Sequence, residues 1–161
     1  MIDCIAKTNW ASNIPMVGGE KIRSAQTDMN GSRIVLLDTP GFGDHTPSDI
    51  VNQIESWLSS NLGPNPARLS GILYLHSISE HCTTRVSPAI LQRLLESEDA
   101  FKVIIVTSMW NKVRRREIAE RRERELHTSY WKELLDLGAN TDRFDDEEET
   151  ARRIVNHLLG T

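Results

Sequence analysis

Three short apolar runs constrain the fold of this chain more than any other feature: Ile34–Leu37, Ile72–Leu75 and Val103–Val106. Each is mostly aliphatic, lacks the alternation of a half-exposed strand, and is too short for a helix. Such runs are typical of parallel strands that are covered on both faces. Apolar residues at helical spacing fill the intervening stretches at 50–58 and 90–95. The order of strands and helices predicts an α/β fold with right-handed crossovers.

A hairpin is expected ahead of the parallel strands. Residues 21–29 alternate loosely and lead into the first apolar run through Asn30-Gly31. Asn-Gly between two strand-like segments is the strongest short signal for a two-residue hairpin turn, because both positions need a positive φ. We therefore expect one antiparallel hairpin that leads into a parallel sheet.

Length and composition narrow the class of protein. The chain has 161 residues, of which 39% are hydrophobic, and a net charge of -4, which predicts one globular domain. No apolar run approaches the roughly 18 residues of a membrane span, and the N-terminal residues resemble neither a secretory signal nor a transit peptide. Cys4 and Cys82 are too few for a disulfide scaffold. We expect a cytoplasmic protein without a transmembrane segment, and the acidic balance argues against a nucleic-acid partner.

The C-terminal third is rich in charge. Residues 111–126 hold seven Lys/Arg and four Glu, and the region 111–137 is predicted to be a charged helix. A solvated, salt-bridged helix is one interpretation, and a basic patch for an anionic partner is the other. We expect an acidic loop at 142–149 and a last helix at 150–159, because acids favour the first turn of a helix and Gly160 favours its end.

The segment most suggestive of chemistry is Asp38-Thr39-Pro40-Gly41, directly after the first apolar run. An Asp at the end of such a strand faces the crevice where α/β sheets bind ligands. Its carboxylate is suited to a Mg²⁺ ion and its bound water, and the glycine lets a backbone N–H approach a phosphate. The alternative is an ordinary turn that follows a strand.

Four segments of the chain, DTPGFGD, GILYLHSIS, VIIVTSMWNKV and YWKELLDLGA, together resemble the P-loop GTPases of the septin- and GIMAP-like branch. The resemblance runs from residue 17 to residue 159 and implies a three-layer Ras-like G domain with a mostly parallel sheet. It implies guanine nucleotide and Mg²⁺ as ligands, with Asp38 as the metal-linked acid and Gly41 as the γ-phosphate sensor. Phe42 stands where Ras-type enzymes carry a Gln that orients the attacking water.

The guanine-reading motif of this family resembles T-x-x-D, and Ser108 and Asn111 fall on its Thr and Asp positions. An Asn side chain presents one acceptor and one NH₂ donor, whereas a carboxylate accepts at both oxygens. The resemblance therefore implies a base site with one acceptor missing. The alternative is that Met109 and Trp110, between them, are simply packing residues beyond a strand.

The phosphate loop is the weakest part of the resemblance. A G-x-x-x-x-G-K-[ST] string cradles phosphates with backbone N–H groups, and the sequence contains none. Lys7 and Thr8 are the nearest candidates for its last two residues, and a chance match is the alternative. The first, central strand of the fold is expected to be missing or reduced as well, which leaves its two neighbours to be paired by a short stub or directly with each other.

These observations predict a single incomplete G domain over residues 1–161 that binds guanine nucleotide weakly and hydrolyses it little. The expected nucleotide-binding residues are Asp38, Thr39, Gly41, Ser108, Asn111, Lys7 and Thr8, with Asp38 also linked to Mg²⁺. The alternative is a pseudo-GTPase interaction module that binds no nucleotide and contacts a protein partner through the loop 42–46 or through the Arg-rich helix.

Overall fold

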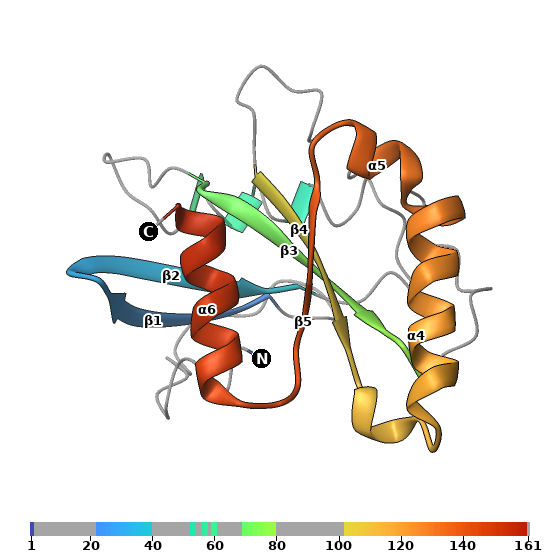
Figure 1. Cartoon of the computed structure of the whole chain (residues 1–161). Helices are drawn as coiled ribbons and strands as arrows, with labels where there is room; N and C mark the ends of the chain where they lie inside the picture. Colours follow the sequence, from blue (N-terminus) through green and yellow to red (C-terminus); the bar gives the residue numbers. More distant parts are fainter. Residues whose placement is uncertain are drawn as a thin grey trace. The chain divides into compact units, whose positions relative to one another are not determined.

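The computed structural model describes residues 1, 22–39, 52–53, 56–57, 59–60, 69–79 and 102–160 (Figure 1). The chain divides into two compact units, Ile2–Arg68 and Leu69–Thr161, and Met1 groups with the second. Each unit is described by itself below. The prediction of one domain over 1–161 stays a prediction.

The smaller unit contains the predicted hairpin. Strand β1 (Arg23–Met29) pairs antiparallel with β2 (Ser32–Asp38). The two turn residues between them have positive φ, 51° at Asn30 and 77° at Gly31, the combination that a two-residue turn between twisted strands needs. The hairpin is therefore confirmed. Residues 52–53, 56–57 and 59–60 of the same unit have helical backbone, whereas the helix expected at 90–95 lies outside the described residues.

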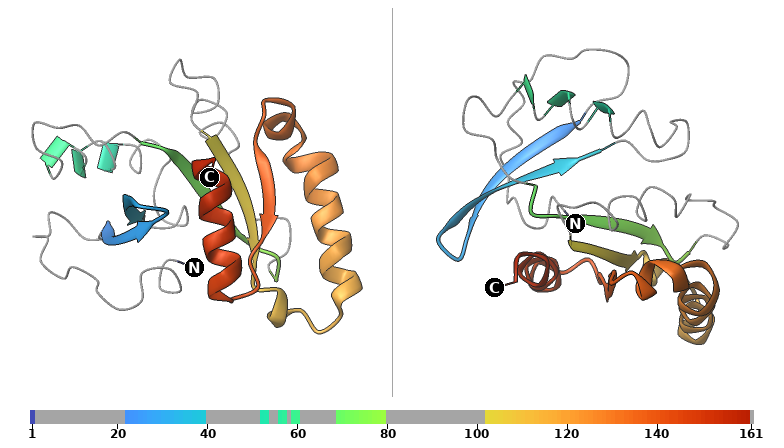
Figure 2. Two further views of the ribbon diagram at one scale, coloured as in Figure 1. Left: turned by 60° about the vertical axis from the view of Figure 1, so that its left-hand side comes forward. Right: turned by 90° about the horizontal axis from the view of Figure 1, so that it is seen from above.

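The larger unit is built on a three-stranded parallel sheet in the order β3-β4-β5. Its strands are β3 (Gly71–Ser77), β4 (Lys102–Ser108) and β5 (Asn140–Arg143), and Figure 2 shows β4 between the other two. The central strand is buried from Val103 to Thr107, as its unbroken apolar run predicts. The α/β class is confirmed. The run Ile34–Leu37 was expected to form a parallel strand covered on both faces, but it lies in β2, which pairs antiparallel with β1 and has no buried residue.

The charged region does not form the single helix that was expected over 111–137. It consists of a 3-10 turn η1 (Trp110–Lys112), helix α4 (Arg116–Glu125), a π-helical turn η2 (Leu126–Tyr130) and a short helix α5 (Lys132–Asp136). Extended backbone at Val113 (φ -95°, ψ 116°) separates η1 from α4. Towards the C-terminal end of this region, the Thr128 hydroxyl donates a hydrogen bond to the Arg124 carbonyl at 2.9 Å. Such a bond from a side chain to the backbone competes with the regular hydrogen bonds of a helix.

The boundaries predicted for the acidic loop and the last helix differ slightly from those in the structure. The acidic loop expected at 142–149 is shorter, because β5 extends to Arg143 and helix α6 (Glu148–Leu159) starts two residues before the predicted 150. Glu148 and Glu149 lie in the first turn of α6, where acids interact favourably with the helix dipole. The helix ends as predicted at Gly160, which has a left-handed φ of 75° and donates its N–H to the Asn156 and His157 carbonyls.

One face of α6 forms the core against the sheet. Ala151, Ile154, Val155 and Leu158 recur at spacings of three, one and three residues and are all buried, the pattern of an amphipathic helix. At Gly71, the first residue of β3, an added Cβ would lie 2.6 Å from Leu158 Cδ1. Glycine at this position is therefore what allows the last turn of α6 to approach β3 so closely.

Candidate functional site

The carboxyl ends of β3, β4 and β5 meet at one edge of the parallel sheet, and two predicted site residues lie there. Ser108 is the last residue of β4, and its hydroxyl donates to the His76 carbonyl of β3 at 3.3 Å. The Ser108 carbonyl in turn accepts the N–H of Ile78 at 2.9 Å. Ser108 thus joins the ends of two strands. Ligands of open α/β sheets bind outside this type of edge.

Asn111 lies in the η1 turn directly after β4. The turn begins at Met109, whose φ of 61° is left-handed, and it closes when the Lys112 N–H donates to the Met109 carbonyl at 3.1 Å. Asn111 and Lys112 are exposed. Asn111 Nδ2 donates to Asp146 Oδ2 at 3.0 Å, so an amide after β4 is paired with a carboxylate beyond β5.

A network of buried polar side chains holds the η1 turn in place. Thr107 is 0% exposed and Glu123, from α4, is 8% exposed. Thr107 Oγ1 donates to Glu123 Oε1 at 3.1 Å and accepts from Trp110 Nε1 at 3.1 Å. The Trp110 ring is therefore held beside the end of β4, and the position of η1 depends on a side chain of α4.

Arg143 completes the network from the end of β5. Its Nε donates to both Glu123 carboxylate oxygens, at 3.0 and 3.1 Å, and its Nη2 forms an ion pair with the same group. Its guanidinium carbon also lies 4.3 Å from the centre of the Trp110 ring, within the range of a cation–π contact. The hydrogen bond to Glu123 raises the pKa of the Arg143 guanidinium above its ordinary value. Arg143 therefore balances the charge of an almost buried carboxylate.

Asp38 and Thr39, in the smaller unit, have a different environment. Asp38 is the last residue of β2, and the hairpin register places it opposite Arg23. Arg23 Nε donates to Asp38 Oδ2 at 3.1 Å, and Arg23 Nη2 forms an ion pair with the same oxygen. Thr39 follows directly and is exposed.

Residues 40–51, which follow Asp38 and Thr39, lie outside the described residues, so a magnesium site at Asp38 stays a prediction. A magnesium site needs several oxygen ligands without a competing cation, and here a guanidinium already contacts the carboxylate. Among the described residues, no group of three or more His, Cys, Asp or Glu side chains is arranged to hold a metal. The predicted residues Lys7, Thr8 and Gly41 and the loop 42–46 lie outside the described residues.

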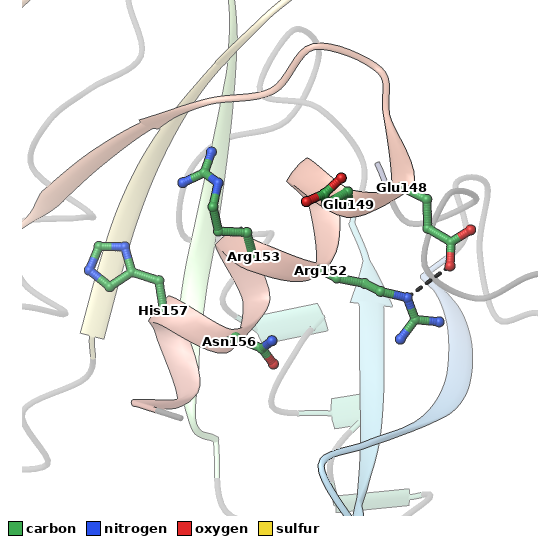
Figure 3. A pocket seen from close by; sticks show the side chains of 6 residues that line it. All are labelled: Glu148, Glu149, Arg152, Arg153, Asn156 and His157. Atoms are coloured by element: carbon green, nitrogen blue, oxygen red, sulfur yellow. Dashed lines mark hydrogen bonds and ion pairs between the residues drawn. The ribbon is translucent and has the colours of Figure 1, made fainter.

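Two further polar surfaces were not predicted. One lies on the exposed face of α6, where the side chains come from successive turns of the helix and Arg152 Nε donates to Glu148 Oε1 at 2.8 Å (Figure 3). The full lining is Glu148, Glu149, Arg152, Arg153, Asn156 and His157. Successive members of this set are alternately one and three residues apart, a pattern that is present in the sequence and indicates a solvated helix face with i,i+4 ion pairs.

The second surface is a small pocket beside β5, with a lining that comes from α4, η2, β5 and α6. Arg153 forms two hydrogen bonds to the Asp142 carboxylate, at 2.6 and 2.9 Å, which raise the pKa of Arg153 above its ordinary value. The lining residues are Glu123, His127, Thr141, Asp142, Arg143 and Arg153. No pattern in the sequence links these residues, because they come from four separate elements.

No family model matches the chain, and no curated protein matches it at a significant level. The described part of the chain contains no helix that is long and apolar enough to cross a membrane. The likeness to P-loop GTPases therefore rests on the sequence motifs alone.

Proposed function

We propose that this chain is a guanine-nucleotide-binding domain of the P-loop GTPase class, with weak nucleotide binding and little hydrolysis. The observation that carries the proposal is the position of Asn111. This residue, on the Asp position of the T-x-x-D-like motif, lies at the carboxyl edge of a parallel sheet, which is where nucleotide sites of α/β proteins form. The hairpin that precedes the parallel strands is a second feature that fits the class.

Weak binding follows from what the sequence lacks. Without a G-x-x-x-x-G-K-[ST] string, the phosphates lose the backbone N–H cradle that supplies most of their contacts in P-loop proteins. Lys7 and Thr8 are the residues that we propose for a reduced phosphate contact, and Thr39 and Gly41 for the phosphate-facing turn after β2. Mg²⁺ stays a prediction, and no step of the proposal passes through the metal ion.

Slow hydrolysis follows from the segment after Asp38. Phe42 has no group that can orient a water molecule, and the Asp38 carboxylate already forms an ion pair with the Arg23 guanidinium. We expect phosphate release from Mg²⁺-GTP below about 10⁻⁴ per second, the scale of the intrinsic Ras reaction. Single-turnover phosphate release by the purified, monodisperse protein measures this rate. Turnover at or above that scale would show that another residue activates the water.

Calorimetric titration with GDP, GTP and ATP tests binding itself. We expect GDP and GTP to bind and ATP to bind less tightly, and Asn111→Ala to weaken GDP binding by about tenfold, the loss of one good hydrogen bond. Asn140→Ala is the matched control, because Asn140 is also an exposed asparagine but lies at the opposite, amino end of β5. Equal effects of the two variants would contradict a base site at η1.

The alternative is an interaction module that binds no nucleotide, and one observation favours it. Lys112, Arg114 and Arg115 are exposed cations just before the start of α4, where positive charge is unfavourable next to the helix dipole. An anionic protein surface would offset that charge. If titration gives no heat with any nucleotide while the protein melts cooperatively, the alternative replaces the proposed function.

A further inference from the structure

The carboxylate of Glu123, on α4, joins side chains from two neighbouring strands. Thr107 Oγ1 of β4 donates to Glu123 Oε1 at 3.1 Å, and Arg143 Nε of β5 donates to both carboxylate oxygens at 3.0 and 3.1 Å. Only 11% of the surface of the Glu123 side chain is exposed, so its hydrogen bonds to Thr107 and Arg143 take the place of most of its hydration. Glu123 therefore holds two side chains at the carboxyl edge of the sheet.

The two residues that Glu123 holds both contact Trp110. Trp110 Nε1 donates to the Thr107 hydroxyl at 3.1 Å, which secures the edge of the indole. The guanidinium carbon of Arg143 lies 4.3 Å from the centre of the same ring and covers one of its faces. A guanidinium that forms a bidentate pair with a carboxylate while it stacks on an aromatic ring has a fixed orientation. One carboxylate thus controls both an edge contact and a face contact of Trp110.

Apart from the hydrogen bond between Asn111 and Asp146, the η1 turn has few anchors. None of its three residues is buried, and no side chain caps its start. It begins after Met109, whose left-handed φ of 61° is unfavourable for a residue with a side chain. The Trp110 carbonyl accepts the Val113 N–H at 3.3 Å, so Trp110 belongs to the turn by its backbone and to the buried network by its side chain. The position of the next residue, Asn111, follows from that of Trp110.

We infer, on the basis of the proposed function, that Glu123 is a positioning residue for the base site. It holds Trp110 through Thr107 and Arg143, and it thereby sets where Asn111 meets the base of a guanine nucleotide. Glu123 itself does not touch the nucleotide. Hydrogen bonds weaken steeply when donor and acceptor are misaligned, so a shift of η1 lowers base recognition specifically.

Glu123→Gln tests this role, because it removes the charge that pairs with Arg143 and places an NH₂ donor opposite a donor of Arg143 or Thr107. We expect the ratio of GDP to ADP affinity to fall by about tenfold, the effect of one well-aligned hydrogen bond. A general loss of stability reduces the folded population for both nucleotides alike and leaves this ratio unchanged. The ratio therefore separates positioning from a merely structural role.

Glu120→Gln is the matched control, because it is the same change three residues earlier in α4. Glu120 pairs with Arg116 at 3.1 Å and acts on Arg143 through its charge, so this variant removes charge without removing the contact. We expect the ratio to stay unchanged. Arg143→Lys is the second test variant: it keeps a positive charge beside Glu123 but loses the planar fork and the stacking on Trp110, and we expect the ratio to fall.

Titration calorimetry of the full chain with GDP and ADP measures these ratios, with circular dichroism to verify that each variant is folded. In an Asn111→Ala background, Glu123→Gln is expected to leave the ratio unchanged, because the side chain that it positions is already gone. Should Glu123→Gln prevent folding, Arg143→Lys decides in its place.

A ratio that responds to Glu123→Gln and Arg143→Lys, but not to Glu120→Gln, supports the positioning role. If the chain prefers GDP and the ratio is the same in all these variants, the positioning role is wrong while the proposed function stands. An equal effect of Glu120→Gln, or an undiminished effect of Glu123→Gln in the Asn111→Ala background, overturns it in the same way. If the chain binds neither nucleotide or does not prefer GDP, both are wrong.

Discussion

The hydroxyl of Thr107 offers the sharpest test of what holds the candidate site together. Thr107 lies in β4 with 0% exposure, and its Oγ1 contacts Glu123 Oε1 and Trp110 Nε1, each at 3.1 Å. Valine has almost the same shape as threonine and carries a methyl group in place of the hydroxyl. The hydroxyl also lies 3.3 Å from the Asp142 carbonyl oxygen. Thr107→Val therefore removes all three contacts while the volume of the side chain is nearly kept.

The contacts that remain limit the cost of this change. Glu123 keeps its ion pair with Arg143, and Trp110 Nε1 keeps the carbonyl of residue 107 at 3.3 Å, so neither group loses all its partners. The principal loss is a hydrogen bond to a charged group, and we expect the free energy of unfolding to fall by about 1.5–3 kcal/mol. Thr107→Ser keeps the hydroxyl and removes one buried methyl group, for which we expect about 1 kcal/mol.

Urea denaturation followed by circular dichroism measures both variants, with the m-value as a check that the denatured state is unchanged. Valine is expected to destabilise more than serine. In a Glu123→Gln background the cost of Thr107→Val is expected to shrink by about 1 kcal/mol, because the charge-assisted bond is already lost. If serine costs more than valine, packing rather than hydrogen bonding holds this part of the site, and the reasoning fails.

Two further changes test the packing of α6 and its N-terminus. Gly71→Ala brings a Cβ to 2.6 Å from Leu158 Cδ1 and 2.7 Å from the Lys102 carbonyl oxygen, so we expect a loss of about 1–3 kcal/mol in urea denaturation; unchanged stability would mean that α6 is not packed this closely. The hydrogen bond from Thr150 lowers the pKa of Asp145 below 3.8, so its contribution is present above that pH and is lost as the pH falls through the lowered pKa. Asp145→Asn is therefore expected to flatten the pH dependence of Tm as the pH falls below 3.8, and parallel profiles would contradict the assignment.

Features with local causes were predictable from the sequence. The turn at Asn30-Gly31 needs two positive φ angles, and those two residues tolerate them best. The buried run of β4 and the end of α6 at Gly160 likewise depend on residues within a few positions of each other. The break between η1 and α4 was missed, because the charge pattern of 111–126 is helical throughout and the extended backbone at Val113 carries no strong local signal.

Periodicity and turn chemistry act over a few residues, so the strands β3 and β4, the hairpin and the position of Asn111 after the end of a strand could be predicted from local patterns. The partners that these residues meet depend on how the chain folds back on itself. Asp146 reaches Asn111 across 35 residues, and Glu123 reaches Thr107 across 16. Such pairs depend on the order of strands in the sheet and on the path of the crossovers, which no local pattern encodes. The hydrogen bond between Asn111 and Asp146 is therefore visible only in the folded chain.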